Sequence, residues 1–172
     1  MDRAEIEDAL RDVGAELASR ELRGDIVIVG GAWMALVLRA REATRDVDAY
    51  IAPDSAAAVR EAVAAVARRR GLPDDWLNDA VKGFIASAPE TVDWAEYDGL
   101  RVQAVTADYM LAMKALAARP QDVDDLRTLV RHLGITTLAE ALATVERHVP
   151  ARLLTARTSL TLESLFEEEA PS

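Results

Sequence analysis

The chain contains no cysteine, and it has only two histidines and two lysines among its 172 residues. The missing cysteines exclude disulfide bonds and thiolate metal sites. No apolar run reaches the roughly 18 residues that a membrane span needs, and the N-terminal segment lacks the basic start of a signal peptide. About half of the residues are hydrophobic, which is enough for a core. We therefore expect a soluble cytoplasmic protein.

The formal net charge is −10 at neutral pH. Nonspecific binding to nucleic acid needs a basic surface that releases counterions, so this excess of acid argues against it. The net charge does not exclude a local basic entrance to a binding site, because Arg39, Arg41 and Arg45 lie close together in the sequence. The arginine run at 68–70 fits the C-terminus of a helix, where cations suit the helix dipole.

An apolar segment is followed directly by two glycines. We expect a buried strand over 25–29 and a helix over 31–40, with Gly30 and Gly31 at the junction. The free N–H groups at such a helix start are suited to bind an anion. The pattern predicts a phosphate site at the two glycines, although a plain strand-to-helix turn would also explain them.

A second strand, expected over 45–52, carries Asp46 and Asp48 at alternate positions. Side chains alternate between the two faces of a strand, so both carboxylates point to one face. Neighbouring carboxylates repel each other unless a cation lies between them, and Mg²⁺ prefers carboxylate oxygens and nucleotide phosphates. We therefore predict a metal site at these aspartates. The alternative is a pair of solvated acids on an edge strand.

The order of these motifs resembles the nucleotidyltransferase superfamily built on a polymerase-beta-like core. The resemblance is closer to a small bacterial branch that includes the AbiEii-type toxins of toxin–antitoxin systems. In that branch a basic residue, then Thr or Ser, precedes the Asp-apolar-Asp strand, and the corresponding residues here are Arg41, Thr44, Asp46 and Asp48. The resemblance covers roughly residues 25 to 133.

This resemblance implies an α+β fold, in which a small mixed sheet flanked by helices forms a nucleotidyltransferase core over 1–105. A C-terminal helical part over 106–172 is expected to pack on the core. It also implies an enzyme that uses Mg²⁺ or Mn²⁺ to move a nucleoside monophosphate from an NTP to a tRNA or protein acceptor. A cognate antitoxin or toxin would be its partner. Asp46 and Asp48 would hold the metal, and the nucleotide would be bound by Gly30, Gly31, Arg41, Thr44 and Arg45.

A second cluster also resembles that branch, and consists of Lys114, Arg119, Asp122 and Asp125. Lys114 lies in an otherwise apolar helix, expected over 107–118, so its ammonium must reach a carboxylate, a phosphate or solvent. We expect it to point toward Asp46 and Asp48 or toward Asp122. The resemblance gives Lys114 and Asp122 catalytic roles, whereas the simpler reading is an ion pair that docks two helices.

This sequence departs from the pattern of the polymerase-beta-like enzymes at one point. Those enzymes usually add a third carboxylate from a later strand. The strand expected over 100–105 carries Arg101 and Gln103 but no acid, which leaves Glu96 or Asp122 as candidates. If neither supplies the carboxylate, the chain is a catalytically degenerate interaction module with an antitoxin-like or regulatory role.

The remaining elements follow from periodicity and turn signals. Asp98 and Gly99 predict the turn of a hairpin with strands over 91–97 and 100–105. Trp76 is expected to anchor the core from a short helix over 76–84, in which Asn78 is a plain polar residue. Both histidines, His132 and His148, are expected to be ordinary helix-end residues. Further helices are expected at 3–21, up to 70, 120–134, 137–148 and beyond 150.

Overall fold

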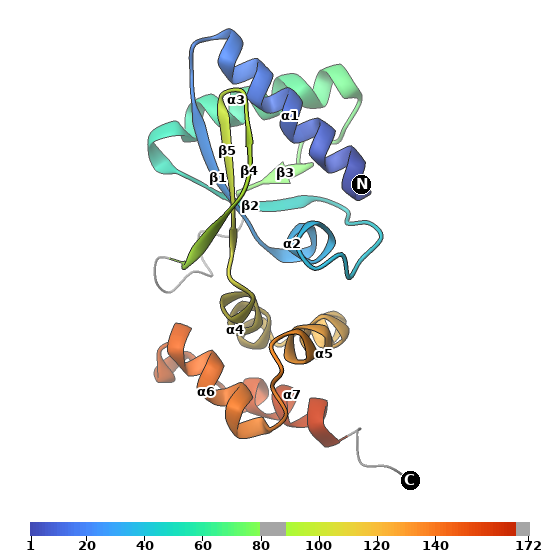
Figure 1. Cartoon of the computed structure of the whole chain (residues 1–172), viewed down its shortest axis with the longest axis vertical. Helices are drawn as coiled ribbons and strands as arrows, with labels where there is room; N and C mark the ends of the chain where they lie inside the picture. Colours follow the sequence, from blue (N-terminus) through green and yellow to red (C-terminus); the bar gives the residue numbers. More distant parts are fainter. Residues whose placement is uncertain (80–88, 168–172) are drawn as a thin grey trace. The chain divides into compact units, whose positions relative to one another are not determined.

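The computed structural model describes residues 1–79 and 89–167. The fold is α+β, as the sequence predicts, with a five-stranded mixed sheet flanked by helices and followed by C-terminal helices (Figure 1). By internal contacts the chain divides into two units. We call Met1–Lys82 with Thr91–Val105 the N-terminal unit, and Gly83–Glu90 with Thr106–Ser172 the C-terminal unit.

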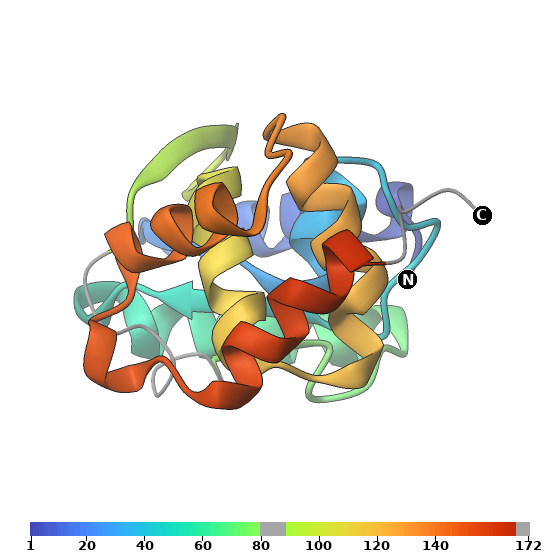
Figure 2. The same cartoon turned by 90° about the horizontal axis from the view of Figure 1, so that it is seen from below.

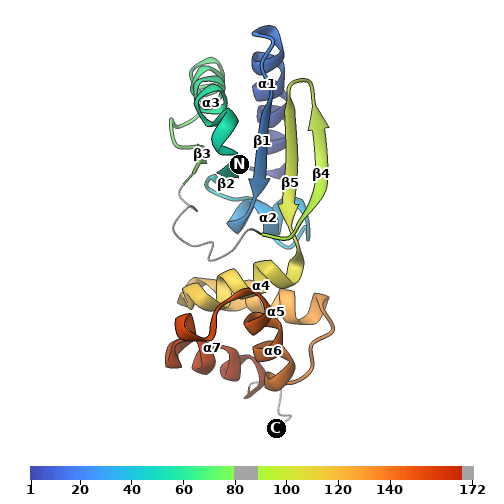
Figure 3. The ribbon, with the colours of Figure 1, turned by 90° about the vertical axis from the view of Figure 1, so that its left-hand side faces the viewer.

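The sheet belongs to the N-terminal unit and has the strand order β3-β2-β1-β5-β4. Its strands are β1 (Gly24–Ile28), β2 (Val47–Ile51), β3 (Leu77–Asn78), β4 (Thr91–Tyr97) and β5 (Leu100–Val105). The central strand β1 pairs antiparallel with β2 and parallel with β5. β4 and β5 form the expected antiparallel hairpin, in which they lie side by side (Figure 3).

One face of this sheet is the core of the unit. Strand alternation places Ile26, Ile28 and Ala49 on this face, and all three are fully buried. They cluster with buried residues of α1 (Arg3–Ser19) and α3 (Ala56–Arg70), which pack against each other. The opposite face therefore carries the intervening polar residues of β2 and β5.

The arginine run at the end of α3 has a structural role. Arg69 Nη1 lies 2.9 Å from Glu16 Oε2, and Arg70 Nε lies 2.6 Å from Asp12 Oδ2, so these ion pairs join α3 to α1. Gly71 ends the helix with a left-handed φ of 67°. The prediction that this run is a helix C-terminus is confirmed.

The C-terminal unit is helical (Figure 2). Its helices are α4 (Ala107–Ala117), α5 (Val123–His132), α6 (Leu138–His148) and α7 (Ala156–Glu167). Thr137 caps α6, and its side chain accepts a hydrogen bond from the Glu140 N–H in a capping box. No helix within the described residues is long and apolar enough to cross a membrane.

Three expected boundaries are wrong. The helix predicted to begin at Trp76 is replaced at Leu77–Asn78 by β3, because these residues pair with β2, and long-range pairing outweighs local pattern. The rest of that predicted helix, at 80–88, lies outside the described residues. α2 (Gly30–Leu36) stops short of residue 40, and β2 begins after Asp46, which occupies a bend.

Candidate functional site

Gly30 and Asp48 are in direct contact where β1 ends. A Cβ atom built on Gly30 would lie 2.5 Å from Asp48 Oδ2, and Gly30 has a φ of +66°. The Val29 N–H donates to the Asp48 carbonyl over 3.0 Å, which extends the pairing of β1 with β2. A side chain at position 30 would therefore be strained by the backbone conformation and would have to displace the Asp48 carboxylate.

Gly31 has an equally close neighbour in the loop that joins α2 to β2. A Cβ atom at Gly31 would lie 2.6 Å from Thr44 Oγ1 and 3.9 Å from Arg41 Nη1. The Thr44 hydroxyl donates to the Asp46 carbonyl over 3.1 Å, and the Thr44 N–H donates to the Met1 carbonyl over 2.9 Å. This loop thus folds back on the glycines, and Arg45 in the same loop is exposed.

Asp46 and Asp48 lie on the same side of the sheet, together with Asn78. Val47 and Ala49 are buried in the core, whereas the two aspartates are half-buried. In the register of β2 with β3, Asp48 lies opposite Asn78, and Asn78 Nδ2 makes a long contact of 3.5 Å to Asp46 Oδ2. The expectation of a plain helical Asn78 is wrong, because β3 brings its amide to the aspartates.

The donors at this place suit a hard cation. Mg²⁺ is commonly held by one or two carboxylates, with phosphate oxygens and water completing its shell. In the residues that the structure describes, no group of three or more His, Cys, Asp or Glu is placed to hold a metal ion. Asp46 and Asp48 supply two carboxylates, which is within the number that commonly holds Mg²⁺ together with phosphate and water.

Neither β5 nor Glu96 of β4 brings a third acid to this place. β5 contributes Gln103, which shares a cross-strand row with Val27 and Tyr50. Glu96 lies opposite Arg101, in a row about 13 Å along the strands from Asp48 and three strand spacings of about 4.8 Å away. Glu96 is too distant to share a metal ion with Asp48, so it is ruled out as the missing carboxylate.

Lys114 lies in a buried ion cluster of the C-terminal unit. Its Nζ is 2.7 Å from Asp122 Oδ1 and 2.6 Å from Asp125 Oδ2, and the three side chains are 8%, 11% and 5% exposed. Of the two partners expected for Lys114, the structure shows Asp122, and it adds Asp125. This cluster joins α4 to the short 3-10 turn Pro120–Asp122 and to α5.

A second pair of opposite groups in the C-terminal unit joins the half-buried Asp108 to His148. His148 Nε2 lies 2.9 Å from Asp108 Oδ2, and the His148 ring packs edge-on against Tyr109 with centroids 5.3 Å apart. Burial raises the pKa of Asp108, but the neighbouring Thr106 hydroxyl and His148 outweigh it and bring the pKa to about 2. His148 ends α6, as expected, but it is not an ordinary helix-end residue, since it contacts a carboxylate 40 residues away in the sequence.

Comparison with known proteins bears on the N-terminal unit. A family model described as nucleotidyl transferase of unknown function (DUF2204) matches residues 6–78. The matched segment runs from α1 to β3, and it includes both glycines and both aspartates of the candidate site. No curated protein and no solved structure matches the chain. The family description names neither an acceptor nor a toxin–antitoxin role.

Proposed function

We propose that the chain moves a nucleoside monophosphate from an NTP to an RNA or protein acceptor. The match of residues 6–78 to a family model described as nucleotidyl transferase supports this proposal. The observation that carries the proposal is the contact between the Gly30 backbone and the Asp48 carboxylate. It joins two motifs that are separate in the sequence into one place, where a phosphate and a cation would meet.

The nucleotide-binding residues have distinct roles in this proposal. Gly30 and Gly31 have no side chains of their own, and in this proposal a triphosphate would approach the N–H groups beside Asp48 and Thr44, which contact the two glycines. α2 has only seven residues, and its dipole is correspondingly small, so we assign the positive charge at the phosphates to Arg41 and Arg45. Thr44 positions the loop through its hydrogen bond to the Asp46 carbonyl.

Asp46 and Asp48 would hold the Mg²⁺ or Mn²⁺ ion, and Asn78 would orient Asp46. When bound there, the ion would neutralise charge on the triphosphate and on the departing pyrophosphate. The hydrogen bond from the Val29 N–H fixes the backbone of Asp48, so its carboxylate is held at Gly30 before any ligand arrives.

The proposal also keeps Lys114 as a phosphate-binding residue and Asp122 as the third carboxylate. Each already contacts the other, at 2.7 Å. A role in transfer therefore requires Lys114 to exchange a carboxylate for a phosphate, and this would free Asp122 to accept the proton of the acceptor hydroxyl.

We include in the proposal a tRNA end or a protein hydroxyl as acceptor, and a toxin–antitoxin pair as the setting. The competing function is a degenerate interaction module, antitoxin-like or regulatory. The observation that favours it is that β5 carries Gln103 and Arg101, and no acid, on the face of the sheet that it shares with Asp48.

A thermal-shift experiment tests the proposal. Mg²⁺ with the correct NTP is expected to raise the melting temperature of the wild-type protein. A ligand present at a free concentration of 100 times its Kd adds about 2.7 kcal/mol to the free energy of unfolding. Asp48→Asn should abolish the rise, because the amide keeps the shape but loses the charge. Asp54→Asn, which changes an exposed acid elsewhere, should keep it. No shift with any of the four NTPs would favour the degenerate module.

Isotope labelling then identifies the group that is transferred. With an NTP labelled at the α-phosphate, the acceptor should become labelled, and with the γ-phosphate labelled it should not. The opposite pattern would indicate phosphoryl transfer and would contradict the proposal.

A further inference from the structure

The outer edge of β4 has no neighbouring strand in the part of the chain that the structure describes (Figure 3). β4 has seven residues, so this edge is about 23 Å long at roughly 3.3 Å per residue. The outward N–H and C=O groups of an edge strand are a template for pairing with another strand. β3, at the opposite edge, has two residues and offers far less.

The side chains of β4 limit what can pair with it. The strand contains no lysine or proline, the residues that commonly protect an edge, and Val92 is 51% exposed. A register shift between Asp93 and Ala95 interrupts it once. Asp93 and Glu96 are exposed acids, so two copies of β4 side by side would bring like charges together. The edge is therefore poorly suited to self-association.

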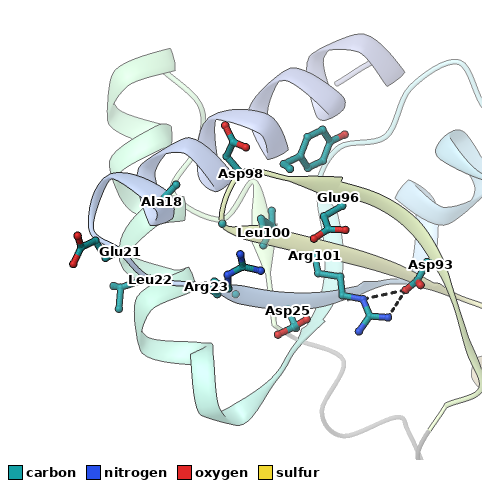
Figure 4. Close-up of a pocket in the computed structure, with 13 residues that line it drawn as sticks. Ala18, Glu21, Leu22, Arg23, Asp25, Asp93, Glu96, Asp98, Leu100 and Arg101 are labelled. Atoms are coloured by element: carbon teal, nitrogen blue, oxygen red, sulfur yellow. Dashed lines mark hydrogen bonds and ion pairs between the residues drawn. The ribbon is translucent and has the colours of Figure 1, made fainter.

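A hollow of about 920 Å³ lies next to this edge, at the turn end of the hairpin (Figure 4). β4, β5, the start of β1 and the loop after α1 line it. Five acids and two arginines line it: Glu21, Asp25, Asp93, Glu96 and Asp98, with Arg23 and Arg101. Arg101 is already engaged by Asp93 at 2.7 Å, which leaves the hollow with an excess of negative charge.

We propose that the β4 edge and this hollow form a docking surface for an extended basic segment of a partner protein. The segment would add a strand to β4, and its Lys or Arg side chains would lie over the acids of the hollow. The register supports this, since Glu96, Arg101 and Asp25 share one cross-strand row and hence one face. The acidic charge disfavours nucleic acid at the same surface.

The test uses the full chain and a defined probe. The probe is a blocked seven-residue peptide of alternating Lys and Val, and binding is measured by fluorescence anisotropy at low and physiological salt. One comparison peptide has Glu in place of Lys, and another keeps Lys and Val but has alternate backbone nitrogens methylated. Both should bind at least tenfold more weakly, the first because of charge and the second because it cannot complete the strand pairing. Hydrogen exchange should slow at residues 91–97 when the Lys–Val peptide binds.

Matched variants place the binding on this surface. Glu96→Lys with Asp98→Lys should weaken the Lys–Val peptide at least tenfold, and Glu96→Gln with Asp98→Asn should act in the same direction with less risk to folding. Glu42→Lys with Asp124→Lys changes exposed acids that do not line the hollow, and should leave binding unchanged. Equal binding of the N-methylated peptide, unchanged exchange in β4, protection of β4 by single-stranded RNA, or a dimer formed through β4 would each overturn the proposal.

Discussion

The glycines of this chain differ in what requires them. Gly30 combines a left-handed φ with a carboxylate against its Cα, whereas Gly71 has almost the same φ and no neighbouring atom within 4 Å of the point where a Cβ would lie. A helix cap explains Gly71 completely. At Gly30 the close approach of Asp48 is an additional demand, and this difference between two glycines of similar backbone conformation is what marks the candidate site.

The two glycines give a matched pair of substitutions. Gly71→Ala should cost roughly 1–2 kcal/mol of unfolding free energy, the usual cost of a left-handed conformation at a non-glycine residue. Gly30→Ala should cost more, because its methyl group displaces the Asp48 carboxylate, and it should also abolish the melting-temperature rise with Mg²⁺ and NTP. Urea denaturation and thermal shift measure the two effects. Equal costs with the nucleotide effect retained would show that Gly30 is merely a turn residue.

Lys114 gives a second prediction at the scale of single residues. Lys114→Met should lower the free energy of unfolding by about 3 kcal/mol, because it leaves the buried Asp122 and Asp125 carboxylates without a cation. Combining it with Asp122→Asn and Asp125→Asn should restore much of that loss. Urea denaturation is the measurement, and an unchanged midpoint for Lys114→Met would contradict a buried cluster.

The same variants separate structure from function. If Lys114 contacts phosphate, folded Lys114→Met protein should lose the effect of Mg²⁺ and NTP on melting temperature. If the cluster only docks α4 to α5, the triple variant should keep that effect.

At the scale of elements, charges at helix ends connect the start of α4 to the end of α6. Asp108 lies in the first turn of α4 and accepts a hydrogen bond from the Tyr109 N–H. His148 and Arg147, in the last turn of α6, approach the same Asp108 oxygen at 2.9 and 3.6 Å. Acid at a helix N-terminus and base at a C-terminus both suit the helix dipoles, so one carboxylate serves two elements.

This contact has a pH dependence with a definite sign. The pKa of Asp108 is about 2 in the folded protein, below its ordinary 3.8, so the ionised form contributes stability above pH 4 and loses it as the pH falls toward 2. Asp108→Asn should therefore reduce the free energy of unfolding by about 2 kcal/mol at pH 7, and flatten its decline between pH 4 and 2. Urea denaturation across this range checks both.

Asp124→Asn is the matched control for that experiment. Asp124 also lies in the first turn of a helix, but its side chain is 94% exposed and its partner is the nearby Arg127. An exposed pair of this kind contributes little, so the pH profile should follow the wild type. The same profile for both variants would show that the pair of Asp108 with His148 contributes no stability.

At the scale of the whole molecule, the net charge of −10 governs nonspecific contacts. A homopolymeric RNA should show no binding by fluorescence anisotropy at about 100 μM protein and physiological salt. The acidic protein offers few Lys or Arg side chains that could neutralise RNA phosphates. Tight binding with a steep salt dependence would contradict this. If the proposed acceptor is RNA, it would be recognised at a local site, such as the arginines of the loop before β2, and not by a general RNA-binding surface.

The sequence by itself determined the features that depend on short-range pattern. The alternation of Val47, Asp48 and Ala49 set the faces of β2, and Asp98 with Gly99 set the hairpin turn. By resemblance to a known family, the order of the glycines and aspartates predicted a nucleotidyl transferase, and a family model of that description matches residues 6–78. These features follow from strand period, turn chemistry and spacing, which neighbouring residues fix without the rest of the fold.

The tertiary structure decided the contacts between distant segments. Pairing of β3 with β2 brought Asn78 to the aspartates, and the register of β4 with β5 removed Glu96 from them. Packing of α4 with α6 gave His148 its carboxylate. The reason is that register and packing are selected by the burial of the whole core. The partner of a polar residue in a short segment therefore cannot be predicted until the strands or helices that pack beside that segment are known.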